Sequence, residues 1–149
     1  MTTTEPETVL PTSSKVLCAA YGVIAIAALI ATWSQNIAYL DTPSGLGGFW
    51  TDTKVNPASR SITVDIVLFS IAAAILMVIE ARQHGVRFVW LYIAGGLLIA
   101  ISVTFPLFLI AREVRVGRKQ PTRLGPVDTT ALILAAAAAA AFVVWVDIG

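Results

Sequence analysis

Two carboxylates lie within or beside one apolar stretch of this 149-residue chain, and their chemistry most needs an explanation. Asp65 and Glu80 are separated by fifteen positions. On a helix, that separation is about 22 Å along the axis and about 60° around it. The two acids therefore share a helix face, but they are too far apart to act on one bond as a general acid and base.

The polar residues nearest Asp65 come from the loop that precedes it. We predict a candidate polar site made of Asp65, Trp50, Asn56, Ser59 and Arg60. Charged side chains within a bilayer are costly unless they have a partner or a function. Asp65 also fits a first-turn acid that the helix dipole stabilises, so the sequence leaves two interpretations open.

Glu80 stands at the other end of the same stretch, beside basic residues. We predict interfacial ion pairing among Glu80, Arg82 and Arg87, with His84 as a further neighbour. His84 is the single histidine, and a lone histidine in a basic turn indicates neither a metal site nor a catalytic base. Cys18 is the single cysteine, which excludes an intrachain disulfide. We therefore predict no metal.

The composition is that of a membrane protein. Hydrophobic residues make up 57% of the chain and charged residues 13%, against about 25% charged residues in soluble proteins. The formal net charge of +1 does not indicate nucleic-acid binding. The chain has no recognisable catalytic or cofactor motif, and we predict no cofactor.

Four apolar stretches predict an all-α transmembrane bundle of four spans, at about 16–36, 62–81, 88–111 and 129–147. Residues 1–14 are polar and predict a disordered tail, which leaves 15–149 as a single four-helix transmembrane domain. Gly95 and Gly96 favour a close helix neighbour, and Pro106 predicts a kink in the third span.

The basic residues predict an orientation in the membrane. With four spans, the termini and the second loop share one side, which holds three basic residues, namely Lys15, Arg82 and Arg87, and the other seven lie in the first and third loops. The positive-inside rule then places the first and third loops in the cytoplasm and both termini outside, in the cell (inner) membrane. If the short basic turn between the second and third spans dominates, the opposite orientation follows.

A combination of short motifs resembles an uncharacterised bacterial family of small integral membrane proteins, a domain of unknown function. The matching residues lie between about 20 and 116: Phe49-Trp50, Asn56-Pro57-Ala58, Asp65, Glu80-Ala81-Arg82, Trp90, Pro106-Leu107-Phe108-Leu109 and Arg112-Glu113. Gln83 stands where the family pattern has a second arginine, and the alanine-rich fourth span lies beyond the family core. The resemblance implies the membrane fold and the importance of these positions, without implying an activity.

These features favour a non-enzymatic binding or accessory module whose partners are membrane lipid, other membrane proteins or a second copy, and not nucleic acid. One alternative is an isomerase or cyclase for an isoprenoid-like lipid, with Asp65 as proton donor and Phe49, Trp50 and Trp90 around an apolar pocket. Another is a proton-coupled transporter or ion-conducting oligomer with Asp65 as the carrier. Convergence of Asp65, Asn56 and Trp50 on one pocket would favour binding or catalysis.

Overall fold

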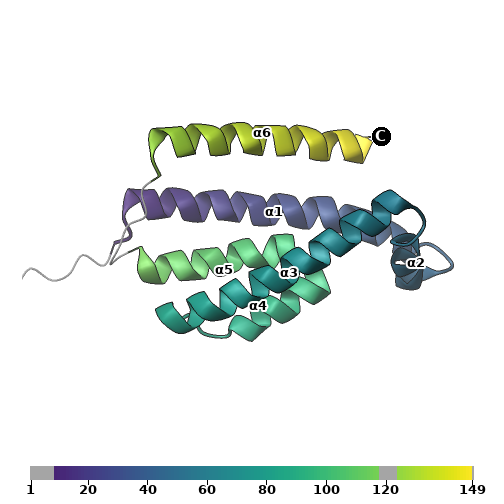
Figure 1. Ribbon diagram of the computed structural model, residues 1–149, viewed down its shortest axis with the longest axis horizontal. Helices are drawn as coiled ribbons and strands as arrows, with labels where there is room; N and C mark the ends of the chain where they lie inside the picture. The colour runs from purple at the N-terminus through teal and green to yellow at the C-terminus, as the bar shows by residue number, and fades with distance from the viewer. Residues whose placement is uncertain (1–8, 118–123, 149) are drawn as a thin grey trace, which may run out of the picture.

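The computed structural model describes residues 9–117 and 124–148, and these parts of the chain form helices and no strand (Figure 1). The elements are α1 (Thr12–Leu40), α2 (Gly45–Asp52), α3 (Pro57–His84), α4 (Val89–Gly95), the π-helix η1 (Gly96–Ala100), α5 (Ile101–Val116) and α6 (Pro126–Ile148). Four helical segments are long and apolar enough to cross a membrane: α1, α3, the segment from Val89 to Val116, and α6. The predicted all-α fold with four apolar spans is confirmed.

The N-terminal end of α1 reaches into the predicted tail. Residues 1–8 lie outside the described residues, but the helix begins at Thr12, and Ser14 is fully buried. Residues 12–14 therefore belong to the folded domain, because they complete the first turn of a helix that packs along α5.

The second span begins five residues earlier than predicted, because the loop supplies a cap. The amide of Ser59 donates to Asn56 Oδ1 at 2.9 Å, and the amide of Asn56 donates to Ser59 Oγ at 3.2 Å. This reciprocal pair is a capping box, and Pro57 occupies the first helical position, where its missing N–H costs nothing. Asp65 consequently lies two turns inside α3, beyond the turn where the helix dipole stabilises an acid.

The third apolar segment folds back on itself. Its backbone is extended at Ala100, with φ −179° and ψ 141°, and the chain reverses there so that α5 packs against α4. The rings of Tyr92 and Phe108 consequently meet edge to face, with their centroids 5.7 Å apart. A straight helix would hold these residues about 24 Å apart along its axis. The segment from Val89 to Val116 is therefore a helical hairpin.

The hairpin revises two expectations about this segment. Pro106 lies buried within α5, and the bend falls six residues before it, at the extended residue. The close neighbour expected at the paired glycines is the second half of the same segment: a Cβ on Gly95 would stand 3.0 Å from Thr104 Cγ2. Glycine removes the side chain that would separate the two arms.

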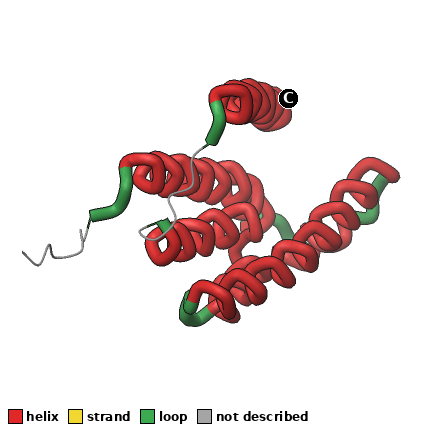
Figure 2. Tube along the Cα trace, turned by 60° about the vertical axis from the view of Figure 1, so that its left-hand side comes forward, coloured by secondary structure: helices red, strands yellow, loops and turns green. Residues whose placement is uncertain are grey.

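The core lies between α3 and the hairpin. Met77 of α3 and Phe108 of α5 are completely buried, and the surrounding buried residues are Ala73, Ala81, Val86, Val89 and Ile101. α1 packs along α5 on the other side (Figure 2). In both views α6 stands apart, and none of its side chains from Pro126 to Val146 is buried.

The reversal decides which ends of the helices meet. The start of α1, the end of α3 and the end of α5 gather at one end of the molecule, whereas α2 lies at the other (Figure 1). The loop between α1 and α3 and the end of α5 are therefore at opposite ends of the described structure. The predicted orientation of the first and third loops rested on a third segment that crosses the membrane once, and that orientation stays a prediction.

Candidate functional site: a charged cluster at one end of the bundle

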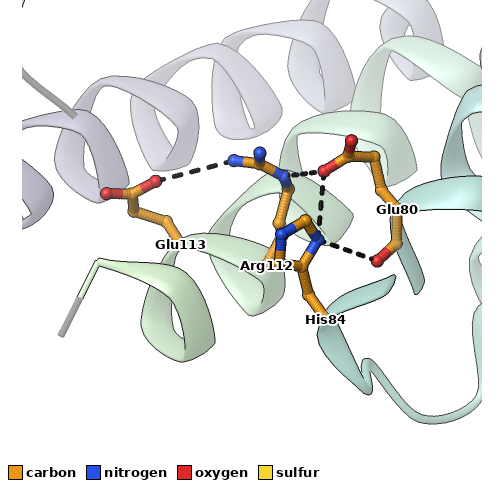
Figure 3. Close-up of polar contacts among 4 residues, drawn as sticks. All are labelled: Glu80, His84, Arg112 and Glu113. Carbon is orange, nitrogen blue, oxygen red and sulfur yellow. Dashed lines mark hydrogen bonds and ion pairs between the residues drawn. The ribbon is translucent and has the colours of Figure 1, made fainter. Parts of the chain in front are cut away.

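Glu80 is the centre of a charged cluster that joins α3 to α5 (Figure 3). Its Oε2 accepts a hydrogen bond from Arg112 Nε, and His84 Nδ1 lies 3.3 Å from the same oxygen. His84 Nδ1 also lies 3.1 Å from the backbone oxygen of Glu80. Both oxygens are acceptors, so the Nδ1 atom of His84 carries the hydrogen in this arrangement.

The local sequence positions each member of the cluster. α3 ends at Gly85, which adopts the left-handed conformation with φ 67° that is typical of a C-terminal cap. The turn that follows buries Val86 and Val89 against the core and directs α4 back along α3. The second reversal at Ala100 then returns α5 to the same end, which brings Arg112 to Glu80.

A buried carboxylate extends the cluster toward α1. Glu113 is 2% exposed, and its Oε2 lies 3.9 Å from Arg112 Nη1. Among the described residues, Glu113 Oε1 and Ser14 Oγ are both buried without a hydrogen-bond partner. Both atoms lie next to Gly117. A Cβ atom added to that glycine would overlap Ser14 Oγ and would stand 2.9 Å from Glu113 Oε1. Gly117 thus allows α1 and α5 to approach closely.

The charges in this cluster do not balance when His84 is neutral. Glu80 and Glu113 contribute two negative charges and Arg112 one positive charge, so the sum is minus one. Breaking a partly buried ion pair leaves an uncompensated charge and is strongly unfavourable. The arrangement is suited to holding α1, α3 and α5 together. Within residues 9–117 and 124–148, no group of three His, Cys, Asp or Glu residues is placed to hold a metal.

The predicted ion pairing of Glu80 forms with a different arginine. Arg82 and Arg87 are exposed at the α3–α4 turn, and neither has an ion pair within the described parts of the chain. Arg112 takes that place because the hairpin returns α5 to the end of α3. Sequence distance concealed this pair, since 32 residues separate its members.

The predicted polar site around Asp65 comes together only in part. Asn56, Ser59 and Arg60 form a local cluster, in which Arg60 Nε donates to the backbone oxygen of Asn56 at 3.4 Å. This cluster caps α3. Asp65 lies nine residues further on, about 13 Å along the helix, where its side chain is exposed.

Trp50 belongs to the corner between α1 and α2. Its ring meets Phe49 edge to face at 5.5 Å, and Phe49 in turn meets Tyr39 of α1 at 5.6 Å. Tyr39 Oη donates to Asp52 Oδ2 at 2.9 Å, which fastens α2 to α1. No hydrogen bond or ring contact among the described residues links Trp50 to Asp65. Phe49 and Trp50 therefore contribute to packing at this corner.

Comparison with known proteins identifies a family for the larger part of this chain. Residues 20–114 match the model of a family described as "Protein of unknown function DUF2834". The chain belongs to this family. No match was found among curated proteins or among solved structures.

The DUF2834 region contains the whole helical hairpin except its last two residues. It also contains Glu80, His84, Arg112 and Glu113. α6 lies beyond it, in agreement with the sequence-based view of the fourth span as an addition to the family core. The charged cluster is therefore built within the family region and extends to α1 through Ser14 and Gly117, which lie outside it.

No site was predicted from the sequence at Arg112, Glu113, Ser14 or Gly117. The available signal was the Arg112-Glu113 pair directly after an apolar segment, together with two adjacent glycines in the middle of that segment. Charges directly after a straight apolar segment are equally well explained as the point where that segment leaves the membrane. The reversal at Ala100 is what gives them partners.

Proposed function

We propose that this protein is a non-enzymatic module of the cytoplasmic membrane that works by packing against another membrane-embedded helix, in the first instance that of a second copy. The observation that supports the proposal is the exposed carboxylate of Asp65. It lies about 8 Å from the midpoint of α3, and it points about 120° away from Met77 in the core. A charge at this depth is costly unless a neighbouring helix or water covers it.

α6 provides a second exposed surface against which another helix could pack. Its side chains from Pro126 to Val146 are all exposed, and seven consecutive alanines, Ala135 to Ala141, form its middle. Alanine presents a smooth surface that lets two helices approach closely. Asp65 and α6 together support association within the membrane.

The enzymatic and transport alternatives receive less support. Trp50 packs at the α1–α2 corner, and Trp90 lies on α4, whose start is at the opposite end of the molecule. An isoprenoid pocket around Asp65 would need both rings beside it. Transport through Asp65 would need a polar route, yet the charged cluster begins at Glu80, about 22 Å further along α3.

We infer an orientation that differs from the one predicted for four straight spans. Five basic residues lie at the end of the molecule where α1 starts: Lys15, Arg82, Arg87, Arg112 and Arg115. Three more follow α5 directly in the sequence: Arg118, Lys119 and Arg123. Lys54 and Arg60 belong to the opposite end. The positive-inside rule then favours a cytoplasmic location for the start of α1 and an external location for the α2 corner.

Association can be measured by energy transfer between labelled copies in lipid vesicles. Ala138→Cys in a Cys18→Ser background gives one labelling position on α6. We expect energy transfer between donor-labelled and acceptor-labelled copies to persist as lipid is added, and Asp65→Leu to reduce it. Ser61→Leu is the matched control, since it changes an exposed polar residue of the same helix without removing a charge. Energy transfer that falls to the value for random encounters in the unsubstituted chain would overturn self-association.

A further inference from the structure

An apolar groove lies where α3 and the tip of the hairpin diverge. Its lining comes from the middle of α3 and from both arms of the hairpin: Val67, Ser70, Ile71, Ala74, Ile93, Gly96, Leu97 and Ile101. The single hydroxyl in this lining already donates to the backbone oxygen of Ile66, at 2.6 Å. The groove therefore offers no free polar side chain and suits a hydrocarbon occupant.

Arg82 lies on the same stripe of α3 as the groove-lining residue Ile71. Ile71 and Arg82 are eleven residues apart, which places them about 20° apart around the helix and about 16 Å apart along it. Val78 lies between them on the same stripe. Arg82 is exposed, and so is Arg87 in the adjoining turn; among the described residues neither forms an ion pair.

The hairpin arm that lines the groove also carries an interfacial aromatic residue. Trp90 and Ile93 are three residues apart on α4 and share one face. Trp90 is 63% exposed at the start of the arm, whereas Ile93 lines the groove. Tryptophan is favoured at the boundary between headgroups and hydrocarbon, so its position marks the depth at which a lipid headgroup would lie.

We propose that this groove binds one chain of an anionic phospholipid, whose headgroup pairs with Arg82 and Arg87. The length favours lipid over a second protein helix. About 16 Å from Arg82 to Ile71 matches one leaflet of a hydrocarbon core about 30 Å thick, and the hairpin tip ends the path at that depth. Arg82 and Arg87 supply the charge that selects an anionic headgroup. This site is independent of the self-association proposed above.

The test uses Trp90 as a reporter of bound lipid in vesicles. Trp33→Phe, Trp50→Phe and Trp145→Phe leave Trp90 as the single tryptophan. Its fluorescence is quenched by brominated acyl chains, carried either by phosphatidylglycerol or by phosphatidylcholine at equal mole fraction. We expect stronger quenching by the anionic lipid, with an apparent affinity ratio that falls about fivefold for each arginine removed in Arg82→Gln and Arg87→Gln.

Two further variants separate a specific site from general charge attraction. Arg60→Gln removes an exposed arginine at the opposite end of α3 and should leave the ratio unchanged. Ala74→Phe fills the groove and should reduce quenching by both lipids while the arginines remain. Equal quenching by the two brominated lipids in the unsubstituted chain, or the same loss of preference in Arg60→Gln, would overturn the proposal. So would Ala74→Phe with full quenching.

Discussion

Glu80 and Arg112 form an ion pair although 32 residues of chain separate them. A straight helix from the α3–α4 turn would carry Arg112 about 35 Å away from the end of α3. The pair can therefore form only because the chain reverses at Ala100. It fastens the returning arm of the hairpin to the helix from which the hairpin departs.

The hairpin can be checked by a distance between spin labels. Labels at Arg87→Cys and Val114→Cys, in a Cys18→Ser background, would lie about 40 Å apart on a straight helix. We expect a much shorter distance, because both positions lie at the same end of the bundle. Pulsed electron resonance measures it directly. Ile62→Cys with Arg82→Cys is the control, since α3 is continuous and should give about 30 Å.

The ion pair should contribute measurably to stability. Glu80→Gln and Arg112→Gln each leave a partly buried charge without its partner, so both single variants should lower the free energy of unfolding. We expect the double variant to lose less than the sum, with a coupling of about 1–3 kcal/mol. Unfolding in mixed micelles with increasing dodecyl sulfate provides the measurement. Arg82→Gln, which removes an exposed arginine, should change little; a similar loss there would contradict the assignment.

Close contact between α1 and α5 depends on Gly117. Gly117→Ala would place a methyl group against Ser14 Oγ, and overpacking of this kind costs about 1–3 kcal/mol. Removing the hydroxyl in Ser14→Ala should relieve part of that cost, so the double variant should be more stable than the sum of the single changes predicts. Gly22→Ala is the control, because a Cβ there meets no atom within 4 Å. Equal destabilisation by the two glycine substitutions would contradict this account.

The polar cluster before α3 should affect stability through capping. Asn56→Ala removes the acceptor for the Ser59 amide, and loss of such a cap costs about 1 kcal/mol. Energy transfer between copies should stay at its original value, because the cap lies apart from Asp65. Ser61→Ala provides the comparison, since it changes an exposed serine that lies outside the capping box.

Orientation can be tested by labelling from one side of the membrane. We expect Val55→Cys, beside the α2 corner, to react with an impermeant maleimide applied to intact cells. Arg115→Cys should react only after the membrane is opened. Both positions are exposed, so access by the reagent depends on the side of the membrane. Protection of both positions in intact cells would restore the orientation predicted from four spans, and the reverse pattern would contradict both orientations.

The sequence by itself determined the four apolar helical segments and their membrane character. Long apolar stretches of this kind form helices in lipid, because each backbone group must find its partner within the segment. Gly85 was predictable as the end of α3 for a local reason, namely the positive φ that glycine adopts readily. Asn56, Ser59 and Pro57 also act through neighbours within three residues, and their roles are equally local.

Tertiary structure alone decided where the third segment turns and what its charges meet. Gly95 and Gly96 permit a close neighbour, but their presence does not say whether that neighbour is another span or the same segment returning. The reversal at Ala100 depends on the packing of Tyr92 against Phe108 and on Glu80 reaching Arg112, which are contacts between residues far apart in the chain. Such contacts are the basis of the orientation proposed above, because orientation depends on the number of crossings.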